Sequence, residues 1–187
     1  MKCSVFIATS ADGFIAKKDG DVNWLHEAGK KNIDLGDEAD MGFKEYLSHV
    51  DCLIMGRKCM DAIAKMNLTS EQWPYGDIRI IVLSNHLKSI PESLPKHLEI
   101  YSGDIKKLLS QLENDGHQHA YVDGGATIEG FISEKLIQEV TITKAPIILG
   151  SGIPLFGETN GEINLINAKV KAFKNDFIQE YYEVSYG

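Results

Sequence analysis

The chain has 187 residues, which suits one domain, residues 1–187, with a substantial core. Its composition, 43% hydrophobic and 25% charged, is that of a soluble globular protein, and no apolar run approaches the roughly 20 residues of a membrane span. The net charge of −8 argues against nonspecific nucleic-acid binding, and three cysteines without C-x-x-C spacing argue against a disulfide scaffold or a zinc site and favour a reducing cytoplasm.

The first half of the chain alternates between strand and helix patterns. Strands are predicted over residues 2–8, 51–56, 78–84 and 98–101, and helices over 38–49 and 57–66. Residues 10–25 form a loop rich in glycine and aspartate. This loop is either a hairpin that covers the core or a segment that closes over a flat ring and excludes water.

The second half continues the alternation and then becomes rich in strands. Helices are predicted over 105–114 and 126–136, and strands over 120–123, 139–145, 163–174 and 177–186. Asp104 is the expected N-cap of the first of these helices, and Gly116 ends it. The last two strands form a hairpin through residues 174–176. The order predicts a three-layer α/β domain whose mostly parallel central sheet has an antiparallel hairpin at its edge.

Two segments, Leu53–Lys58 and Tyr121–Thr127, are apolar runs that reach glycine and then change to a helical pattern. Such a junction brings free backbone N–H groups and the positive end of a helix dipole together, and these hold phosphate. Two junctions, with Arg57 and Lys58 beside the first, favour a ligand with more than one phosphate, most plausibly a dinucleotide. The alternative is that both are turns that need glycine for backbone reasons.

Other motifs carry weaker signals. The Gly56 region lacks the spacing of a P-loop, and Gly150-Ser151-Gly152 is followed by Pro154 rather than a helical pattern. Ser10 and Ser84 have no evident His/Asp partners for nucleophilic hydrolysis. His117-Gln118-His119 has no third ligand of suitable spacing, so no metal site is predicted.

Several motifs, taken in chain order, together resemble a known family. They are S-x-D-G-x-I-A with G-x-x-x-W-L, then D-x-L-I-M-G-R-K, V-L-S, V-D-G-G-A and P-I-I-L-G-S-G-I-P-L-F. The set resembles the dihydrofolate-reductase-like superfamily and, more closely, the RibD C-terminal reductase domain of riboflavin biosynthesis in its stand-alone bacterial form. The resemblance implies a dihydrofolate-reductase-like fold, NADPH as cofactor and a homodimer.

The resemblance also implies positions for the cofactor. Ala8 and Ile15 would lie against the nicotinamide, and Ser84, with His86 and Lys88 nearby, would approach the adenosine phosphate. The two glycine junctions would hold the phosphates, through Gly56, Arg57, Lys58 and Cys59 at the first and Gly124, Gly125, Ala126 and Thr127 at the second. The family often has threonine where this chain has Cys59, so a hydroxyl donor to phosphate is lost.

The substrate side is less defined. Gly29 stands where dihydrofolate reductases place an acid, which leaves Glu27 and Asp40 as candidate proton donors. The D-D-P-x-L-x-x-R stretch that holds ribose phosphate in riboflavin reductases is absent between Asp61 and Trp73. Candidate pocket aromatics are Trp24, Trp73 and Tyr75, for which core packing is the alternative.

The expected function is therefore NADPH-dependent hydride transfer to a heterocyclic small molecule, as in 5-amino-6-(5-phosphoribosylamino)uracil reductase. The alternatives are a dihydrofolate or pterin reductase, or a non-catalytic NADPH-binding homodimer, for which the terminal strands and the loop 146–156 would offer apolar contact surface.

Overall fold

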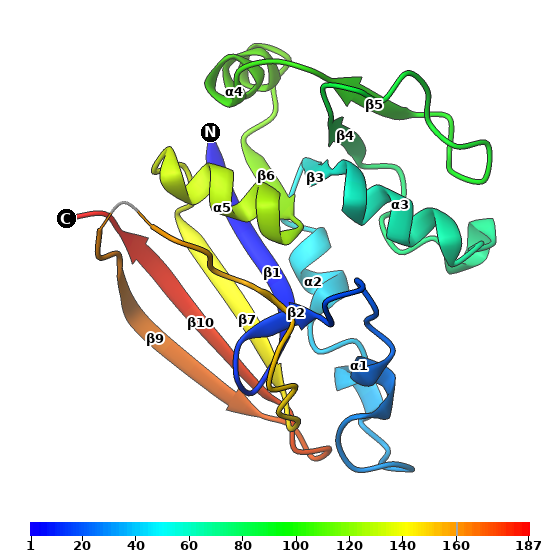
Figure 1. Ribbon diagram of the computed structural model, residues 1–187, viewed down its shortest axis with the longest axis vertical. Helices are drawn as coiled ribbons and strands as arrows, with labels where there is room; N and C mark the ends of the chain where they lie inside the picture. The colour runs from blue at the N-terminus through cyan, green and yellow to red at the C-terminus, as the bar shows by residue number, and fades with distance from the viewer. Residues whose placement is uncertain (160) are drawn as a thin grey trace.

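Strands that are buried on both faces form the centre of the molecule, as expected for a parallel sheet covered by helices. The computed structural model describes residues 1–159 and 161–187. Its main sheet contains, in spatial order, β5 (Leu98–Tyr101), β4 (Arg79–Leu83), β3 (Cys52–Gly56), β6 (His119–Asp123), β1 (Lys2–Ser10), β7 (Glu139–Ala145), β10 (Ile178–Ser185) and β9 (Asn164–Ala172). The strands from β5 to β7 pair in parallel, and β10 and β9 add an antiparallel hairpin at one edge (Figure 1).

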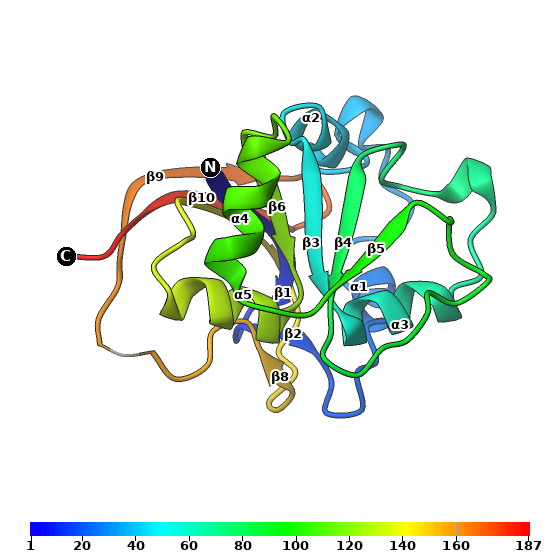
Figure 2. The same cartoon turned by 90° about the horizontal axis from the view of Figure 1, so that it is seen from above.

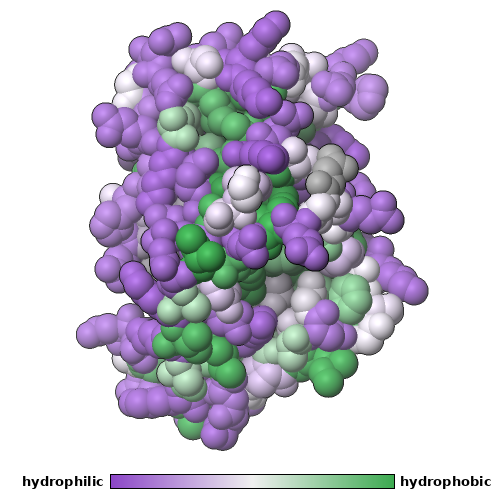
Figure 3. All heavy atoms as spheres, turned by 90° about the vertical axis from the view of Figure 1, so that its left-hand side faces the viewer, coloured by the Kyte–Doolittle hydropathy of each residue, from purple (hydrophilic) through white to green (hydrophobic). Residues whose placement is uncertain are grey.

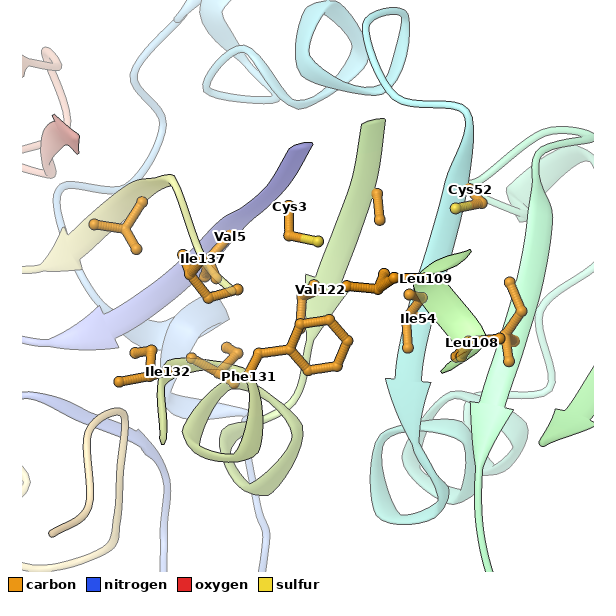
Figure 4. Packing of buried hydrophobic residues seen from close by; sticks show 14 of the residues in the cluster. Cys3, Val5, Cys52, Ile54, Leu108, Leu109, Val122, Phe131, Ile132 and Ile137 are labelled. Atoms are coloured by element: carbon orange, nitrogen blue, oxygen red, sulfur yellow. The ribbon is translucent and has the colours of Figure 1, made fainter. Parts of the chain in front are cut away.

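Helices cover both faces of this sheet. The apolar stripes of α4 (Ile105–Asn114) and α5 (Gly125–Ser133) pack on one face, where Phe131 lies beside Val122 (Figure 4). On the other face, α2 (Phe43–Leu47) and α3 (Arg57–Lys65) pack against the alternate residues of β3 and β4. The predicted three-layer α/β fold with its antiparallel hairpin is confirmed.

The hairpin turn and the N-cap of α4 follow the sequence prediction closely. The Asp104 side chain accepts a hydrogen bond from the backbone N–H of Lys107 at 2.9 Å. The positive φ of Asp176, 71°, lets the chain reverse between β9 and β10. A smaller core at the turn of the β9–β10 hairpin joins α1 (Trp24–Glu27) to the main sheet. In it, Trp24 packs near Phe173 and Phe177.

The continuous helix predicted over 38–49 is wrong. The structure has a short 3₁₀ turn, η1 (Gly36–Glu38), and then α2, which is five residues long. Met41 and Gly42 between them have φ values of 52° and 84°, which a right-handed helix cannot accommodate. The next helix, α3, lies as predicted, and a second 3₁₀ turn, η2 (Ser70–Gln72), precedes the aromatic loop.

The loop predicted over 10–25 contains an unexpected strand. Its β2 (Phe14–Ala16) pairs with β8 (Ile153–Pro154), from a segment more than a hundred residues later, to form a second, two-stranded sheet. Figure 2 shows β2 and β8 at the end of the main sheet toward which the arrowheads of β3, β4 and β5 point. Over the described residues, no helix is both long and apolar enough to cross a membrane.

A crevice between two helix N-termini

The carboxyl ends of β3 and β6 meet where the chain connections diverge. From β3 the chain passes through α3 to β4 on one side, whereas from β6 it passes through α5 and over β1 to β7 on the other. Ligands of open α/β sheets bind at such a switch point, outside the carboxyl ends of the strands. Both predicted glycine junctions lie at this crevice.

Neither helix that begins at the crevice has a side-chain cap. The N-cap residues of α3 and α5 are Gly56 and Gly124, whose N-cap positions carry no side-chain acceptor. The N-terminus of α4, by contrast, is capped by Asp104. The first-turn N–H groups of α3 and α5 are therefore free of side-chain acceptors, and two adjoining dipole ends favour an anion between them.

The two junctions are in direct contact. A Cβ placed on Gly56 would lie 2.7 Å from Oγ1 of Thr127, and one placed on Gly124 would lie 3.4 Å from Cβ of Cys59. Gly124 also has a φ of +92°, a backbone conformation that residues with a side chain rarely adopt. Glycine is thus required here both by backbone conformation and by close approach, and the crevice fits the phosphates of a dinucleotide.

A half-buried acid that the motif analysis did not single out, Asp123, connects the junctions. The Asp123 carboxylate accepts from the thiol of Cys59 at 2.9 Å and from the backbone N–H of Gly124 at 2.9 Å. Burial raises the pKa of Asp123, and it also raises the pKa of Cys59 well above its ordinary value. The Cys59 thiol therefore donates to Asp123, and the expected loss of a phosphate donor at this position concerns a side chain that is engaged elsewhere.

The charged and polar candidates lie around the same end of the sheet. Arg57 forms an ion pair with Asp61 at 2.6 Å on the exposed side of α3, and Lys58 is exposed beside it. Ser84 follows β4, the neighbour of β3, and its Oγ accepts from the backbone N–H groups of His86 and Leu87. Ala126 is exposed on the first turn of α5.

The two-stranded sheet covers the start of α5. The Cδ1 of Ile15 would lie 2.8 Å from a Cβ on Gly125, with the carbonyl oxygen of Pro154 at 3.6 Å. Asp12 links the two segments that form this small sheet. Its carboxylate accepts hydrogen bonds from the Ser10 hydroxyl and from the backbone N–H groups of Leu149 and Gly150. The hydrogen bond from Ser10 is the largest cause that lowers the pKa of Asp12. The sequence segments at 10–16 and 147–155 therefore act as one unit.

A cavity of about 750 Å³ opens on the α2 face of the sheet, at the carboxyl end of β1, the strand next to β6. Its floor includes Phe6 and Ala8 of β1, and its walls include Phe43 of α2, Thr143 of β7 and Phe177 of the hairpin. This volume lies within the range of small-molecule sites. Ala8, one of the predicted cofactor residues, lines this cavity near the end of β1.

The two candidate acids have different surroundings. Asp40 lines the cavity, but its carboxylate accepts from the backbone N–H groups of Lys44 at 3.0 Å and Gly42 at 3.1 Å, which lower its pKa. Its geometry is that of a cap for α2. Glu27 is exposed on α1 and is not among the residues that line the cavity.

The three candidate aromatics are not part of the cavity wall either. Trp24 is 1% exposed and packs behind the wall, in the core with Phe177. Tyr75 is buried beside Phe43, at a ring-centroid distance of 6.2 Å. Trp73 lines a separate cavity of about 240 Å³ beyond α3. Trp24 and Tyr75 thus pack behind residues that line the larger cavity, and the contact of all three aromatics with a ligand stays a prediction.

The fold is that of the dihydrofolate-reductase-like class. Dihydrofolate reductase from Enterococcus faecalis superposes with a TM-score of 0.60 at 14% identity, covering 98% of this chain and 96% of that one. A protein from Shewanella sp. PV-4 that is assigned to riboflavin biosynthesis superposes with a TM-score of 0.86 at 35% identity, covering 99% of both chains.

Sequence comparison gives the family. The model of the RibD C-terminal domain matches residues 2–179. The uncharacterised protein YwjB of Bacillus subtilis is 30% identical over 173 residues, which is 92% of each chain. The chain belongs to the RibD C-terminal domain family, as its motifs predicted.

Proposed function

We propose that the protein is an NADPH-dependent reductase that transfers hydride to a pyrimidine- or pterin-like heterocycle. The observation that carries this proposal is the pair of uncapped helix N-termini at the β3/β6 switch point, together with an open cavity at the carboxyl end of the neighbouring strand β1. When bound, NADPH supplies the hydride. The protein's part is to hold the cofactor and the ring in register and to exclude water.

Different residues of the chain would bind the cofactor and shield its nicotinamide. The first-turn N–H groups of α3 and α5 would bind the pyrophosphate, and the exposed Lys58 and Arg57 would favour a cofactor with an additional phosphate. The two-stranded sheet that contains Ile15 would shield the nicotinamide. The proton would come from water, because the Asp40 carboxylate is held by backbone N–H groups and Glu27 lies off the cavity.

The substrate class rests on the relatives. A reductase like 5-amino-6-(5-phosphoribosylamino)uracil reductase is favoured by the family and by the riboflavin biosynthesis assignment of the Shewanella protein. A pterin reductase is the second candidate, supported by the aromatic rings of Phe6 and Phe43, which both line the cavity with their centroids 5.5 Å apart.

Cofactor binding and turnover are tested separately. Titration of the protein with NADPH and with NADH, followed by the fluorescence of the reduced nicotinamide, should show saturable binding that is tighter for NADPH. Absence of NADPH binding would refute the proposal. Oxidation of NADPH should then be measured across a panel of pterins and aminopyrimidines. Binding without oxidation across the panel would instead favour the non-catalytic alternative.

We infer that two copies associate through the β9 edge. All nine residues of β9 are exposed, and they include Leu165, Ile166 and Val170 at 39%, 43% and 66% exposure. Apolar side chains emerge between charged ones on the side of the molecule that Figure 3 shows. An exposed edge strand of this length normally pairs with another strand or carries charged side chains that prevent pairing.

Val170→Lys should convert a dimer to a monomer in analytical ultracentrifugation, whereas Met66→Lys, at another exposed apolar side chain, should not. A wild-type monomer at micromolar concentration would contradict the inference.

A further inference from the structure

A chain of hydrogen bonds joins the last turn of α2 to the amino ends of β1 and β6, at the end of the sheet away from the crevice. Oη of Tyr46 lies 2.8 Å from Oγ of Ser4, and that Oγ lies 2.7 Å from Nε2 of His119. On the other side of the imidazole ring, Nδ1 lies 2.7 Å from the backbone carbonyl oxygen of His49, two residues after α2. His119 therefore holds the end of α2 at two points, directly at His49 and through Ser4 at Tyr46.

The carbonyl oxygen of His49 fixes the direction of every hydrogen bond in this chain. A carbonyl oxygen can only accept, so Nδ1 of His119 carries the proton and Nε2 of the neutral ring is an acceptor. The hydroxyl of Ser4 then donates to Nε2, and its Oγ accepts from the hydroxyl of Tyr46. Ser4 is 1% exposed, so water has little access to these groups. With His119 neutral, every polar hydrogen in the chain has an acceptor.

Protonation of His119 reverses the chain. Nε2 then donates to Oγ of Ser4, and the Ser4 hydroxyl must turn toward Oη of Tyr46. Burial raises the pKa of Tyr46, so its hydroxyl keeps its proton. That proton has no second partner among the residues that the structure describes, because the Tyr46 ring packs against Phe6 and Tyr121 at centroid distances of 4.9 and 5.1 Å. A hydroxyl without an acceptor in such surroundings costs free energy, so the attachment of α2 weakens.

The groups around His119 keep it neutral at pH 7. Burial is the largest cause that lowers its pKa below the ordinary 6.5, and the hydrogen bond to His49 acts in the opposite direction. Lys2 of β1 lowers the pKa and Glu139 of β7 raises it, but these two side chains form an ion pair at 2.8 Å. Asp51, just before β3, also raises it, although its carboxylate already accepts from two backbone N–H groups at the entry to β6. His119 therefore takes up its proton below the ordinary histidine range.

The helix that His119 holds is a wall of the cavity. Phe43, the first residue of α2, lines the cavity, and its ring lies 5.5 Å from that of Phe6 on the cavity floor. A helix of five residues is not stable by itself, so its position depends on contacts at both ends. The chain before α2 is held by Gln179, whose Nε2 donates to the carbonyl oxygen of Met41 at 2.9 Å. Of these two attachments, only the one at His119 includes a group that titrates near neutral pH.

We propose that His119 is a pH-sensitive switch for the α2 wall of the cavity: protonation of its ring releases the last turn of α2 from the sheet and lets the Phe43 side of the cavity move. Neutral pH keeps the wall in place, and acid loosens it. The switch goes beyond the proposed reductase function and does not depend on which ligand the cavity binds.

Hydrogen exchange of the α2 amides tests the switch. The released ring takes up a proton at higher pH than the held ring, so acid favours release. Exchange at the amides of Tyr46 and Ser48, which donate to Gly42 and Lys44, should be up to about tenfold faster at pH 5.5 than at pH 7.5, after correction for the intrinsic rates. The limit is tenfold because a released histidine with a pKa of about 6.5 lies one unit above the lower pH. The amide of Leu108 in α4 should show no such change.

Variants assign the response to His119. His119→Gln places an amide oxygen near the position of Nε2, where it can accept from Ser4 but cannot gain a proton, so α2 should stay protected at both pH values. Tyr46→Phe should exchange rapidly at both, because the contact with Ser4 is absent whatever the charge of His119. His117→Gln is the matched control: His117 is also half-buried, lies two residues earlier in the chain and takes no part in these hydrogen bonds, so the wild-type response should persist.

Fluorine NMR observes the cavity wall itself. With 4-fluorophenylalanine in place of Phe43, the wild-type protein should give one narrow resonance at pH 7.5 and a second or broadened resonance at pH 5.5. The same label in His119→Gln should give the narrow resonance at both pH values. The midpoint of the change should coincide with the titration of the carbon-bound imidazole protons of His119.

Three results would overturn the proposal: no change in the wild-type α2 amides and fluorine signal between the two pH values, a pH response that survives in His119→Gln, or a response that disappears in His117→Gln. If urea denaturation shows that His119→Gln does not fold, the two midpoints in the wild-type protein decide, and separate midpoints refute the switch. None of these measurements uses a cofactor. They therefore stand whether the NADPH titration supports the reductase function or refutes it.

Discussion

Gly124→Ala tests the crevice most directly. Gly124 has φ +92° and ψ 132°, a region in which a residue with a side chain is strained by about 1–3 kcal/mol. The added methyl group would lie 3.4 Å from Cβ of Cys59 and 4.0 Å from the backbone nitrogen of Gly56. These are ordinary van der Waals distances, so the strain comes from the backbone conformation, and its relief shifts the start of α5 and moves its N–H groups relative to those of α3.

The expected loss of NADPH affinity follows from those N–H groups. A hydrogen bond to a charged group contributes about 1.5–3 kcal/mol. Loss of one such bond to the pyrophosphate corresponds to roughly tenfold to a hundredfold weaker binding. The variant should also lose about 1–3 kcal/mol in free energy of unfolding, measured by urea denaturation without cofactor.

Gly116→Ala provides a matched control. Gly116 has φ +95°, a Cβ there would meet nothing within 4 Å, and it lies just after α4, before β6 begins. This variant should lose a comparable free energy of unfolding but bind NADPH as the wild type does. If fluorescence titration gives both variants the wild-type affinity, the first turn of α5 does not hold the cofactor and the reasoning is refuted.

Three further predictions concern the same end of the sheet. Gly56→Ala should lower the free energy of unfolding by about 1–3 kcal/mol, because its Cβ would lie 2.7 Å from Oγ1 of Thr127. Thr127→Ala should relieve much of that loss in the double variant. If the losses of the two single variants simply add in urea denaturation, this contact is contradicted. Because burial raises the pKa of Asp123, the folded state holds a proton that the unfolded chain releases, so stability should fall as the pH rises from the ordinary carboxyl pKa through the raised one. Asp123→Asn should remove that slope, and an unchanged slope in unfolding free energies measured from pH 4 to 8 would argue against the assignment. Asp12→Asn should speed hydrogen exchange at the amide of Gly150, which donates to Asp12 at 2.7 Å. Unchanged protection of that amide would show that Asp12 does not hold the segment 147–155 against residues 10–16.

Local patterns were sufficient for most of the fold. Buried apolar runs bounded by polar residues predicted the strands, and the capping preference of Asp104 placed the start of α4. The helix predicted over 38–49 failed because Met41 and Gly42 adopt positive φ, which hydrophobic periodicity does not report. The β2–β8 pairing was missed because its short strands, two and three residues long, join distant segments and have little pattern of their own.

The candidate site, like the fold, was predictable from the sequence only in part. The glycine junctions at Gly56 and Gly124 were predictable, because a strand that ends in glycine before a helix is a local signal. The hydrogen bond between Cys59 and Asp123 was not, since it joins the first turn of α3 to the last residue of β6, 64 residues further along the chain. The roles of Ala8, Ile15 and Ser84 toward a cofactor stay predictions.

The sequence by itself determined the family, the eight strands of the main sheet and the two glycine junctions, because each of these is signalled by residues that are close together along the chain. Only the tertiary structure decided the cavity on the α2 face of the sheet. Its wall combines Ala8 of β1, Lys30 after α1, Phe43 of α2 and Asn175 of the hairpin, which no local pattern connects. They meet because the hairpin packs beside β7 and holds the segment after α1 against the sheet, a consequence of burial across the whole domain.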